Sequence, residues 1–277
     1  MKRRFQQWDV FSAQPYLGNP LAVVLDGQGL STQAMQRCTD WSNLSECSFL
    51  TPPTVAGADY AVRIFSPGRE LPFAGHPTLG SCQAWLSAGG QPQGACVVQE
   101  CGVGLVRIRR DGPRLAFAAP ALRRSGPLSA AELLRVTAAL GLQPADVLAA
   151  AWCDNGPPWQ GLLLRSAAQV LALQPDRAAL QGLDVGVIGA HPSTAEVAFE
   201  VRAFFSGAHG VAEDPVTGSL NAALAQWLIG AGLAPDAYVA AQGTALGRAG
   251  RVHVAREGDD LWIGGHSVLC IEGSIEL

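Results

Sequence analysis

Short stretches in which apolar residues alternate with polar ones, or in which β-branched and aromatic residues dominate, recur along the chain. Alternation with a period of two places one face of a strand in a core and the other face in solvent. The pattern therefore predicts a protein rich in strands. The predicted strands cover residues 5–11, 21–25, 60–65, 97–98, 104–108, 114–117, 197–204, 252–254 and 261–263.

Apolar residues spaced three and four apart predict helices in a smaller part of the chain. Ser31 precedes one of these segments and is typical of an N-cap, while Ser129 and Glu132 match a capping box. The predicted helices cover residues 32–41, 78–88, 130–140, 176–180 and 218–229.

The length of the chain favours two domains of about 130 residues each. Hydrophobic residues make up 48% of the 277 positions, which allows large cores and argues against disorder. Residues 119–129, with two prolines, a glycine and several charges, are typical of a linker. We expect an N-terminal domain at 1–120 and a C-terminal domain at 121–277, with a last strand near 267–277 as a candidate to return to the first domain.

The two halves repeat one pattern of strand, glycine-containing loop and apolar helix. In the first half a strand with Arg63 leads to the loop of His76, and in the second a strand with Arg202 leads to the loop of Asp214. The two spacings are nearly equal. We therefore expect His76 and Asp214 to occupy equivalent places.

Each of these loops should start a helix that can bind an anion. Pro77 and Pro215 follow His76 and Asp214 and suit a first helical turn, where a missing N–H is no loss. The unpaired N–H groups of such a turn attract carboxylates and oxyanions. A helix cap without function is the other interpretation of each loop alone. The small residues that would let a ligand approach the backbone are Gly75, Gly218 and Ser219.

Glu46 is a candidate proton-transfer residue. It lies between a predicted helix end and an apolar strand, beside Leu44, Cys47 and Phe49. Partial desolvation by such neighbours would raise the pKa of the carboxyl above its usual value of about 4.3. From these residues alone, a capping or surface glutamate is the favoured interpretation.

The composition excludes several classes of protein. The net charge of −4 and the absence of a dense Lys/Arg run argue against nucleic-acid binding. No run of about 18 apolar residues predicts a membrane span, and the basic start lacks the apolar stretch of a signal peptide, so we expect a cytoplasmic protein. Dinucleotide, P-loop and hydrolase-elbow motifs are absent.

Cysteine and histidine spacings give no metal or disulfide signal, so no metal is expected. The seven cysteines include no C-x-x-C pair and are best explained as reduced, small apolar residues. The histidines without a metal-ligand spacing are His76, His191, His209, His253 and His266.

Several segments together resemble the PhzF-like family of phenazine-biosynthesis isomerases. They are residues 9–11 (DVF), 18–23 (GNPLAV), 43–46 (NLSE), 70–78 (ELPFAGHPT), 213–219 (EDPVTGS), 242–243 (QG) and 247–248 (GR). The resemblance implies an α+β fold of two similar domains, each a mixed β-sheet wrapped around a central helix, as in diaminopimelate epimerase. It also implies a homodimer, a site between the domains and no cofactor.

The resemblance also implies roles for individual residues. Glu46 would transfer the proton, with Asp214 and His76 as further catalytic residues. Racemases of the related fold carry a cysteine at each helix start, which this chain lacks, so a two-thiol racemase is not expected. Leu220 stands where the family usually has a smaller residue and could narrow the pocket. The implied substrate-binding residues are Gly75, Ser219, Gly218, Thr217 and Pro77.

The function that the resemblance implies is a proton shift within a small unsaturated amino or hydroxy carboxylic acid, similar to trans-2,3-dihydro-3-hydroxyanthranilate. Two alternatives stay open at this point. One is an epimerase or racemase with two opposed acid/base groups, and the other is a non-catalytic module that binds small molecules or proteins on the same fold.

Overall fold

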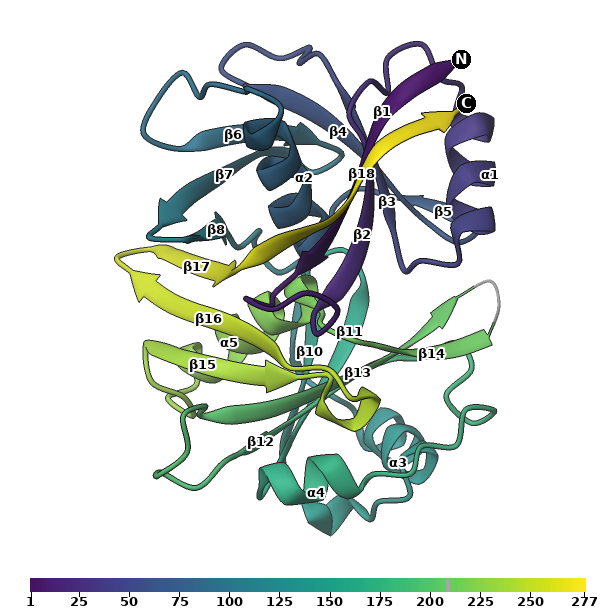
Figure 1. Cartoon of the computed structure of the whole chain (residues 1–277). Helices are drawn as coiled ribbons and strands as arrows, with labels where there is room; N and C mark the ends of the chain where they lie inside the picture. Colours follow the sequence, from purple (N-terminus) through teal and green to yellow (C-terminus); the bar gives the residue numbers. More distant parts are fainter. Residues whose placement is uncertain (208–209) are drawn as a thin grey trace. The chain divides into compact units, whose positions relative to one another are not determined.

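The computed structural model describes residues 1–207 and 210–277 and forms two compact units. One unit comprises Met1–Ala118 and Gly264–Leu277, and the other comprises Ala119–Ile263. The last strand, β18 (Ser267–Glu276), belongs to the first unit and pairs antiparallel with β1 (Lys2–Val10), as Figure 1 shows. His209 lies outside the described residues.

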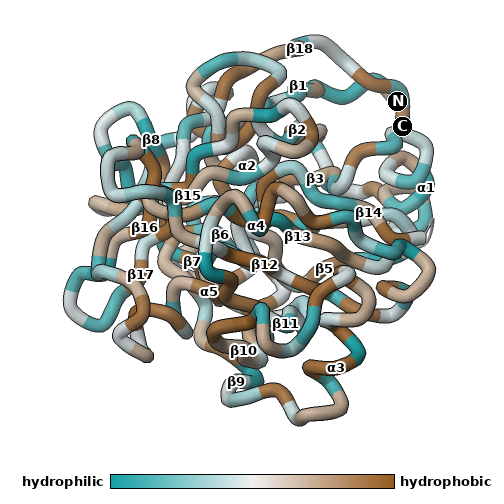
Figure 2. Tube along the Cα trace, turned by 90° about the horizontal axis from the view of Figure 1, so that it is seen from below, coloured by the Kyte–Doolittle hydropathy of each residue, from teal (hydrophilic) through white to brown (hydrophobic). Residues whose placement is uncertain are grey.

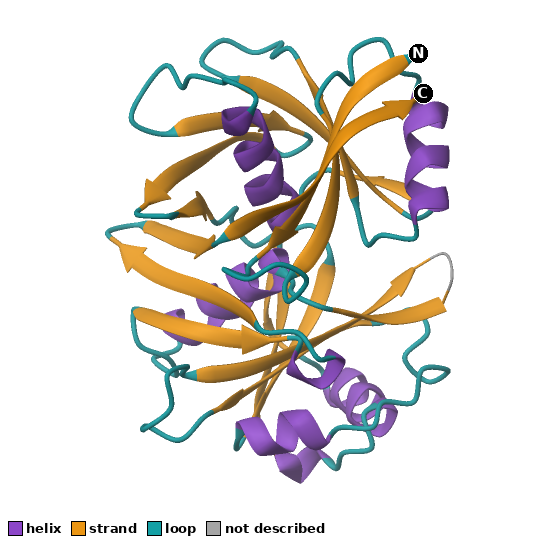
Figure 3. Ribbon diagram, in the orientation of Figure 1, coloured by secondary structure: helices purple, strands orange, loops and turns teal. Residues whose placement is uncertain are grey.

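In the first unit the strands pair in the order β18, β1, β2, β3, β4, β6, β7 and β8, and β5 forms a hairpin with β4. The pairs β2–β3 and β4–β6 are parallel and the others are antiparallel. The sheet wraps around α2 (Gly75–Ser87), while α1 (Thr32–Ser42) packs on its other face (Figure 3). The strands are β2 (Asn19–Val24), β3 (Cys47–Thr51), β4 (Tyr60–Ser66), β5 (Arg69–Leu71), β6 (Val97–Cys101), β7 (Gly104–Asp111) and β8 (Arg114–Ala118).

The second unit repeats this arrangement. Its strands pair in the order β9, β10, β11, β12, β13, β15 and β16, β14 forms a hairpin with β13, and the parallel pairs are β11–β12 and β13–β15. The strands are β9 (Arg124–Pro127), β10 (Val147–Asp154), β11 (Pro158–Leu164), β12 (Asp184–Ala190), β13 (Phe199–Gly207), β14 (Gly210–Asp214), β15 (Ala237–Gln242) and β16 (Gly250–Glu257), and β17 (Asp260–Gly265) crosses the unit boundary. The helices are α3 (Ala130–Ala139), α4 (Ala167–Ala172) and α5 (Gly218–Gly230), with short 3₁₀ turns at Pro144–Asp146 and Thr244–Leu246. The predicted α+β fold with two similar halves is confirmed.

The two central helices are buried because they are apolar or small-sided on every face. Hydrophobic colouring runs along much of α5 in Figure 2, and most residues of α2 and α5 are buried. Small residues let the helices approach their sheets closely. A Cβ on Gly80, for example, would lie 2.5 Å from Cδ2 of Leu21.

The two helix caps were predicted correctly from the sequence, but one of the predicted helices is wrong. Ser31 accepts a hydrogen bond from the backbone N–H of Ala34, and Ser129 forms the full capping box with Glu132. The helix predicted over residues 176–180 is wrong, because that segment is a turn in which Oδ1 of Asp176 accepts hydrogen bonds from two following N–H groups. The nearby helix is α4, which the apolar spacing did not indicate.

Candidate active site

The register of the two hairpins corrects the expected equivalence of His76 and Asp214. Phe65 pairs with Glu70 across β4–β5, and Phe204 pairs with Glu213 across β13–β14. Asp214 therefore ends its hairpin strand at the position that Leu71 occupies in the first unit.

The true counterpart of His76 is Ser219. Each is the second residue of its central helix, after Gly75 or Gly218. The same comparison corrects the prediction for one proline. Pro77 lies in the first turn of α2, as expected, whereas Pro215 precedes Thr217, the N-cap of α5.

Glu46 lies at the end of the connection between α1 and β3. Helix α1 ends at Ser42, its C-cap Asn43 adopts a left-handed conformation with φ of 57°, and β3 begins at Cys47. The side chain of Glu46 is 16% exposed, and its Oε2 lies 3.5 Å from Nε2 of His76. Two predicted catalytic residues of the first unit are thus brought together.

His76 is a neutral imidazole held inside the first turn of α2. Its side chain is 3% exposed, and burial lowers its pKa to about 3. Nδ1 of the ring lies 3.3 Å from Nδ2 of Asn19. Within the described residues, Nε2 makes no hydrogen bond of good geometry, so its approach to Glu46 at 3.5 Å is a close polar contact between a carboxylate and a neutral ring.

Asn19 is placed by a loop that Asp9 holds. Oδ2 of Asp9 accepts hydrogen bonds from the backbone N–H groups of Leu17 at 2.9 Å and Gly18 at 2.8 Å. Gly18 is required there, since a Cβ would lie 2.2 Å from the carbonyl oxygen of Val10. The family-like segments contain Asp9, Gly18 and Asn19, but sequence reasoning assigned them no role.

Asp214 takes part in a second buried network, which Gln242 organises. Thr217 donates its hydroxyl hydrogen to Oδ2 of Asp214 at 2.5 Å. Nε2 of Gln242 donates to Oγ1 of Thr217 at 2.9 Å and to the carbonyl oxygen of Asp214 at 3.1 Å. Oε1 of Gln242 accepts from the N–H of Thr217 and from Nδ2 of Asn221. The family-like QG segment marked Gln242, although its partners could not be predicted.

The hydroxyl oxygen and the backbone carbonyl oxygen of Ser219 each accept a hydrogen bond from the β10–β11 hairpin. Oγ accepts a hydrogen bond from Nε1 of Trp159 at 3.3 Å, and the backbone carbonyl accepts one from Nδ2 of Asn155 at 2.8 Å. Because Oγ already accepts from an indole N–H, its own hydrogen can point to another acceptor.

Both helix starts are suited to an anion. Neither Ala74 nor Thr217, the two N-cap residues, caps its helix with a side-chain hydrogen bond. The positive end of each helix dipole and the first-turn N–H groups can therefore interact with a carboxylate.

Leu220 packs against the sheet of the second unit. Its side chain is fully buried and fills the space in front of Gly186 on β12, where a Cβ would lie 2.2 Å from Cδ1 of Leu220. The larger residue is thus accommodated by a glycine in the sheet.

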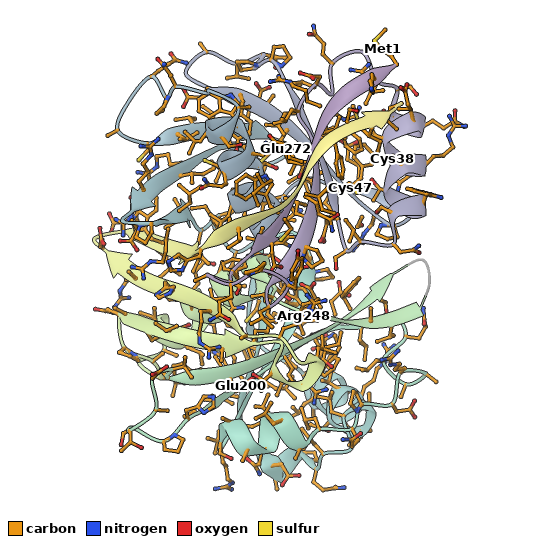
Figure 4. All side chains as sticks on the ribbon, in the orientation of Figure 1. Met1, Cys38, Cys47, Glu200, Arg248 and Glu272 are labelled. Atoms are coloured by element: carbon orange, nitrogen blue, oxygen red, sulfur yellow. The ribbon has the colours of Figure 1, made fainter. Side chains whose placement is uncertain are left out.

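Three buried cysteines, Cys47, Cys82 and Cys153, are unsuited to thiolate chemistry. All seven cysteines are free thiols, and Figure 4 shows Cys38 of α1 near Cys47 of β3. Burial raises the pKa of Cys47 to about 11 and that of Cys153 to about 12, and raises that of Cys82 further. Cys82 lies inside α2 rather than at its start.

The described residues offer neither a metal site nor a membrane-spanning helix. No three His, Cys, Asp or Glu side chains in residues 1–207 and 210–277 gather closely enough to hold a metal ion. No helix in the same part of the chain is long and apolar enough to cross a membrane.

Comparison with known proteins places the chain in a family. Residues 8–273 match the model of the phenazine biosynthesis-like proteins. The chain is 34% identical to antisense-enhancing sequence 1 of Schizosaccharomyces pombe, with 97% of each chain covered. It is also 34% identical to the trans-2,3-dihydro-3-hydroxyanthranilate isomerase of Pseudomonas aeruginosa, with 92% of this chain and 91% of that protein covered.

A solved structure agrees with this assignment. The crystal structure of a phenazine biosynthesis protein of the PhzF family from Enterococcus faecalis superposes with a TM-score of 0.81 at 25% identity, with both chains covered completely. The chain therefore belongs to the phenazine biosynthesis-like (PhzF) family and is an isomerase of that family.

Proposed function

We propose that this isomerase shifts a proton within a small unsaturated amino or hydroxy carboxylic acid similar to trans-2,3-dihydro-3-hydroxyanthranilate, and that Glu46 carries the proton. The observation that carries the proposal is the placement of the Glu46 carboxyl 3.5 Å from the ring of a buried, neutral histidine. The similarity to an isomerase named for that substrate supports the substrate class.

The proton would move in two steps. The carboxylate of Glu46 removes a proton from an activated C–H bond, and the electron pair moves into the conjugated system and its carboxylate. The protonated carboxyl of Glu46 then returns the proton to another carbon, so the substrate is isomerised without oxidation or reduction. General acid–base catalysis of this type contributes a factor of about 10²–10⁴ in rate.

The other site residues would hold the substrate and stabilise its charge. His76 can donate a hydrogen bond, the starts of α2 and α5 can bind carboxylate oxygens, and Ser219 can donate its hydroxyl. Asp214 would accept a hydrogen bond from an amino or hydroxyl group. That both helix starts act on one substrate molecule stays a prediction from the family resemblance, as do the homodimer and the cytoplasmic location.

The test is turnover of trans-2,3-dihydro-3-hydroxyanthranilic acid in D₂O, followed by ultraviolet absorbance and deuterium incorporation. We expect wild-type protein to change the chromophore and incorporate deuterium, and Glu46→Gln to lose about 10²-fold or more in rate. Glu276→Gln is the control, since that carboxyl is 73% exposed. Near-wild-type turnover by Glu46→Gln would refute the role of Glu46.

The alternatives give different results in the same experiment. An epimerase would exchange the Cα hydrogen of an amino acid without a new chromophore, and a binding module would exchange none. If wild-type protein fails on this substrate, deuterium exchange into a panel of small amino and hydroxy acids separates another isomerase substrate from these two cases.

A further inference from the structure

We infer that Asn19 is a positioning residue that fixes the imidazole of His76 in one tautomer, with its hydrogen on Nε2, the ring nitrogen that lies 3.5 Å from Oε2 of Glu46. The inference deepens the proposed function, because it decides what His76 can do beside Glu46. Its structural part rests on contacts within the first unit and can be tested without a substrate.

The direction of the hydrogen bond follows from the chemistry of the two atoms. Nδ2 of Asn19 is an amide nitrogen, which donates hydrogen bonds and does not accept them. It lies 3.3 Å from Nδ1 of His76 in a buried setting. With the Asn19 amide in this orientation Nδ1 accepts, which means that it carries no hydrogen. A neutral imidazole has one ring hydrogen, so that hydrogen is on Nε2.

Asn19 is held firmly enough to impose this choice. It is fully buried at the first position of β2, where it pairs with Val10 of β1. The residues before it are fixed by two hydrogen bonds to Asp9, which is itself 2% exposed. The close approach of Gly18 to Val10 leaves this loop little room to move.

The tautomer determines the role of His76. With hydrogen on Nε2, the ring has its donor on the side where Oε2 of Glu46 lies 3.5 Å away, and it can donate to a substrate oxygen that enters beside the carboxylate. The other tautomer would place a lone pair against the carboxylate, which is unfavourable. His76 is thus a hydrogen-bond donor and not a second base, which favours a proton shift by Glu46 alone over a two-base epimerase that uses His76.

Long-range ¹H–¹⁵N correlation spectra of the histidine rings test the assignment directly. The His76 signals are identified by their loss in His76→Gln. We expect a single neutral tautomer with hydrogen on Nε2 in wild-type protein at pH 7. A protonated Nδ1, or a mixture of the two tautomers, would overturn the inference whatever the activity of the protein.

Substitution of Asn19 provides the second arm of the test. In Asn19→Asp the new carboxylate can accept a hydrogen from Nδ1, so we expect His76 to gain hydrogen on Nδ1 at pH 7. We expect kcat to fall by about 10- to 100-fold, the range known for hydrogen-bond partners that orient metal-ligating histidines, and the pH profile of kcat to gain a new limb. Unchanged ring signals in a folded Asn19→Asp would contradict the inference.

Gln99→Glu is the matched control. Gln99 is also a fully buried amide of the first unit, and it contacts α2 through Thr78 instead of His76. The His76 ring signals should be unchanged in Gln99→Glu. If they change as they do in Asn19→Asp, the effect of Asn19→Asp is nonspecific. If the wild-type tautomer is as inferred but Glu46→Gln stays active, the proposed function fails and the role of Asn19 stands.

Discussion

Arg202 and Glu213 form a buried, two-pronged ion pair across the β13–β14 hairpin. Nε and Nη2 of the guanidinium each lie 2.8 Å from one carboxylate oxygen. Nη1 also donates to the carbonyl oxygens of Val170 and Leu173 at the end of α4. Arg202 therefore links the end of α4 to the β13–β14 hairpin.

The same pair exists in the first unit, but in a different environment. Arg63 and Glu70 occupy the equivalent register positions on β4 and β5 and approach to 2.6 Å. Their side chains are 32% and 39% exposed, whereas those of Arg202 and Glu213 are 7% and 10% exposed. Solvent screens the first pair and leaves the second in a low-dielectric setting.

We expect the two arginines to contribute very differently to stability. Arg202→Met leaves a buried carboxylate without its partner and should cost about 3–5 kcal/mol in the free energy of unfolding. Arg63→Met should cost about 0–1 kcal/mol. Urea unfolding of both variants, monitored by fluorescence and circular dichroism, measures the difference. Equal losses would show that burial does not control the strength of this pair.

Leu220 and Gly186 should be coupled in stability. Because a Cβ at position 186 would overlap Cδ1 of Leu220, Gly186→Ala should cost about 1–3 kcal/mol through overpacking. Leu220→Ala alone should cost about 2–5 kcal/mol, since it leaves a cavity. In the double variant the added methyl enters that cavity, so the combined loss should be smaller than the sum by about 1 kcal/mol. Strict additivity in a double-mutant cycle would contradict this packing.

Local features of the fold could be predicted because they depend on neighbours in sequence. The caps at Ser31 and Ser129 are examples, since each bonds to an N–H three residues on. The equivalence of His76 and Asp214 was wrong because the second hairpin is longer than the first, so equal sequence spacing led to different structural positions.

The contacts that define the site needed the structure. Glu46 and His76 could be named from the sequence, but the contact of His76 with Asn19 joins residues 57 positions apart. That contact depends on the packing of α2 against β2, which no local pattern specifies. The partners of Gln242 are similarly distant, at 21 to 28 positions.

Acid should destabilise the protein partly through His76. Its pKa is about 3 in the folded protein and near 6.5 when unfolded, so between these values only the unfolded chain binds the proton. This contribution to stability is present above pH 6.5 and is lost as the pH falls toward 3. The slope from this one group is about 1.4 kcal/mol per pH unit.

Urea unfolding of wild-type protein and His76→Gln between pH 7 and 5 checks this expectation. Carboxyl groups such as Asp26, whose pKa is lowered by its hydrogen bond to Arg4, change stability in the same direction only at lower pH. The wild-type curve should fall more steeply than that of His76→Gln. His266→Gln is the control, because His266 is partly exposed and its removal should change the slope less. Parallel curves for wild type and His76→Gln would mean that the pKa of His76 is not lowered in the folded protein.

The hydroxyl of Thr217 should hold the carboxylate of Asp214 in its working orientation. Because Oγ1 of Thr217 accepts a hydrogen bond from Nε2 of Gln242, its own hydrogen is directed at Oδ2 of Asp214. Thr217→Val keeps the volume but removes this bridge, leaving both Gln242 and Asp214 short of a partner. We expect a loss of about 1–3 kcal/mol in stability and a fall in kcat.

Thr217→Ser separates the hydroxyl from the methyl group, since it retains the bridge and loses only packing. Its kcat should stay close to that of wild type, while kcat of Thr217→Val falls, and unfolding measurements on both variants show whether the loss of activity exceeds the loss of folded protein. If Thr217→Ser loses as much activity as Thr217→Val, the methyl group and not the hydroxyl matters. The network from Gln242 through Thr217 would then stabilise the loop without orienting Asp214.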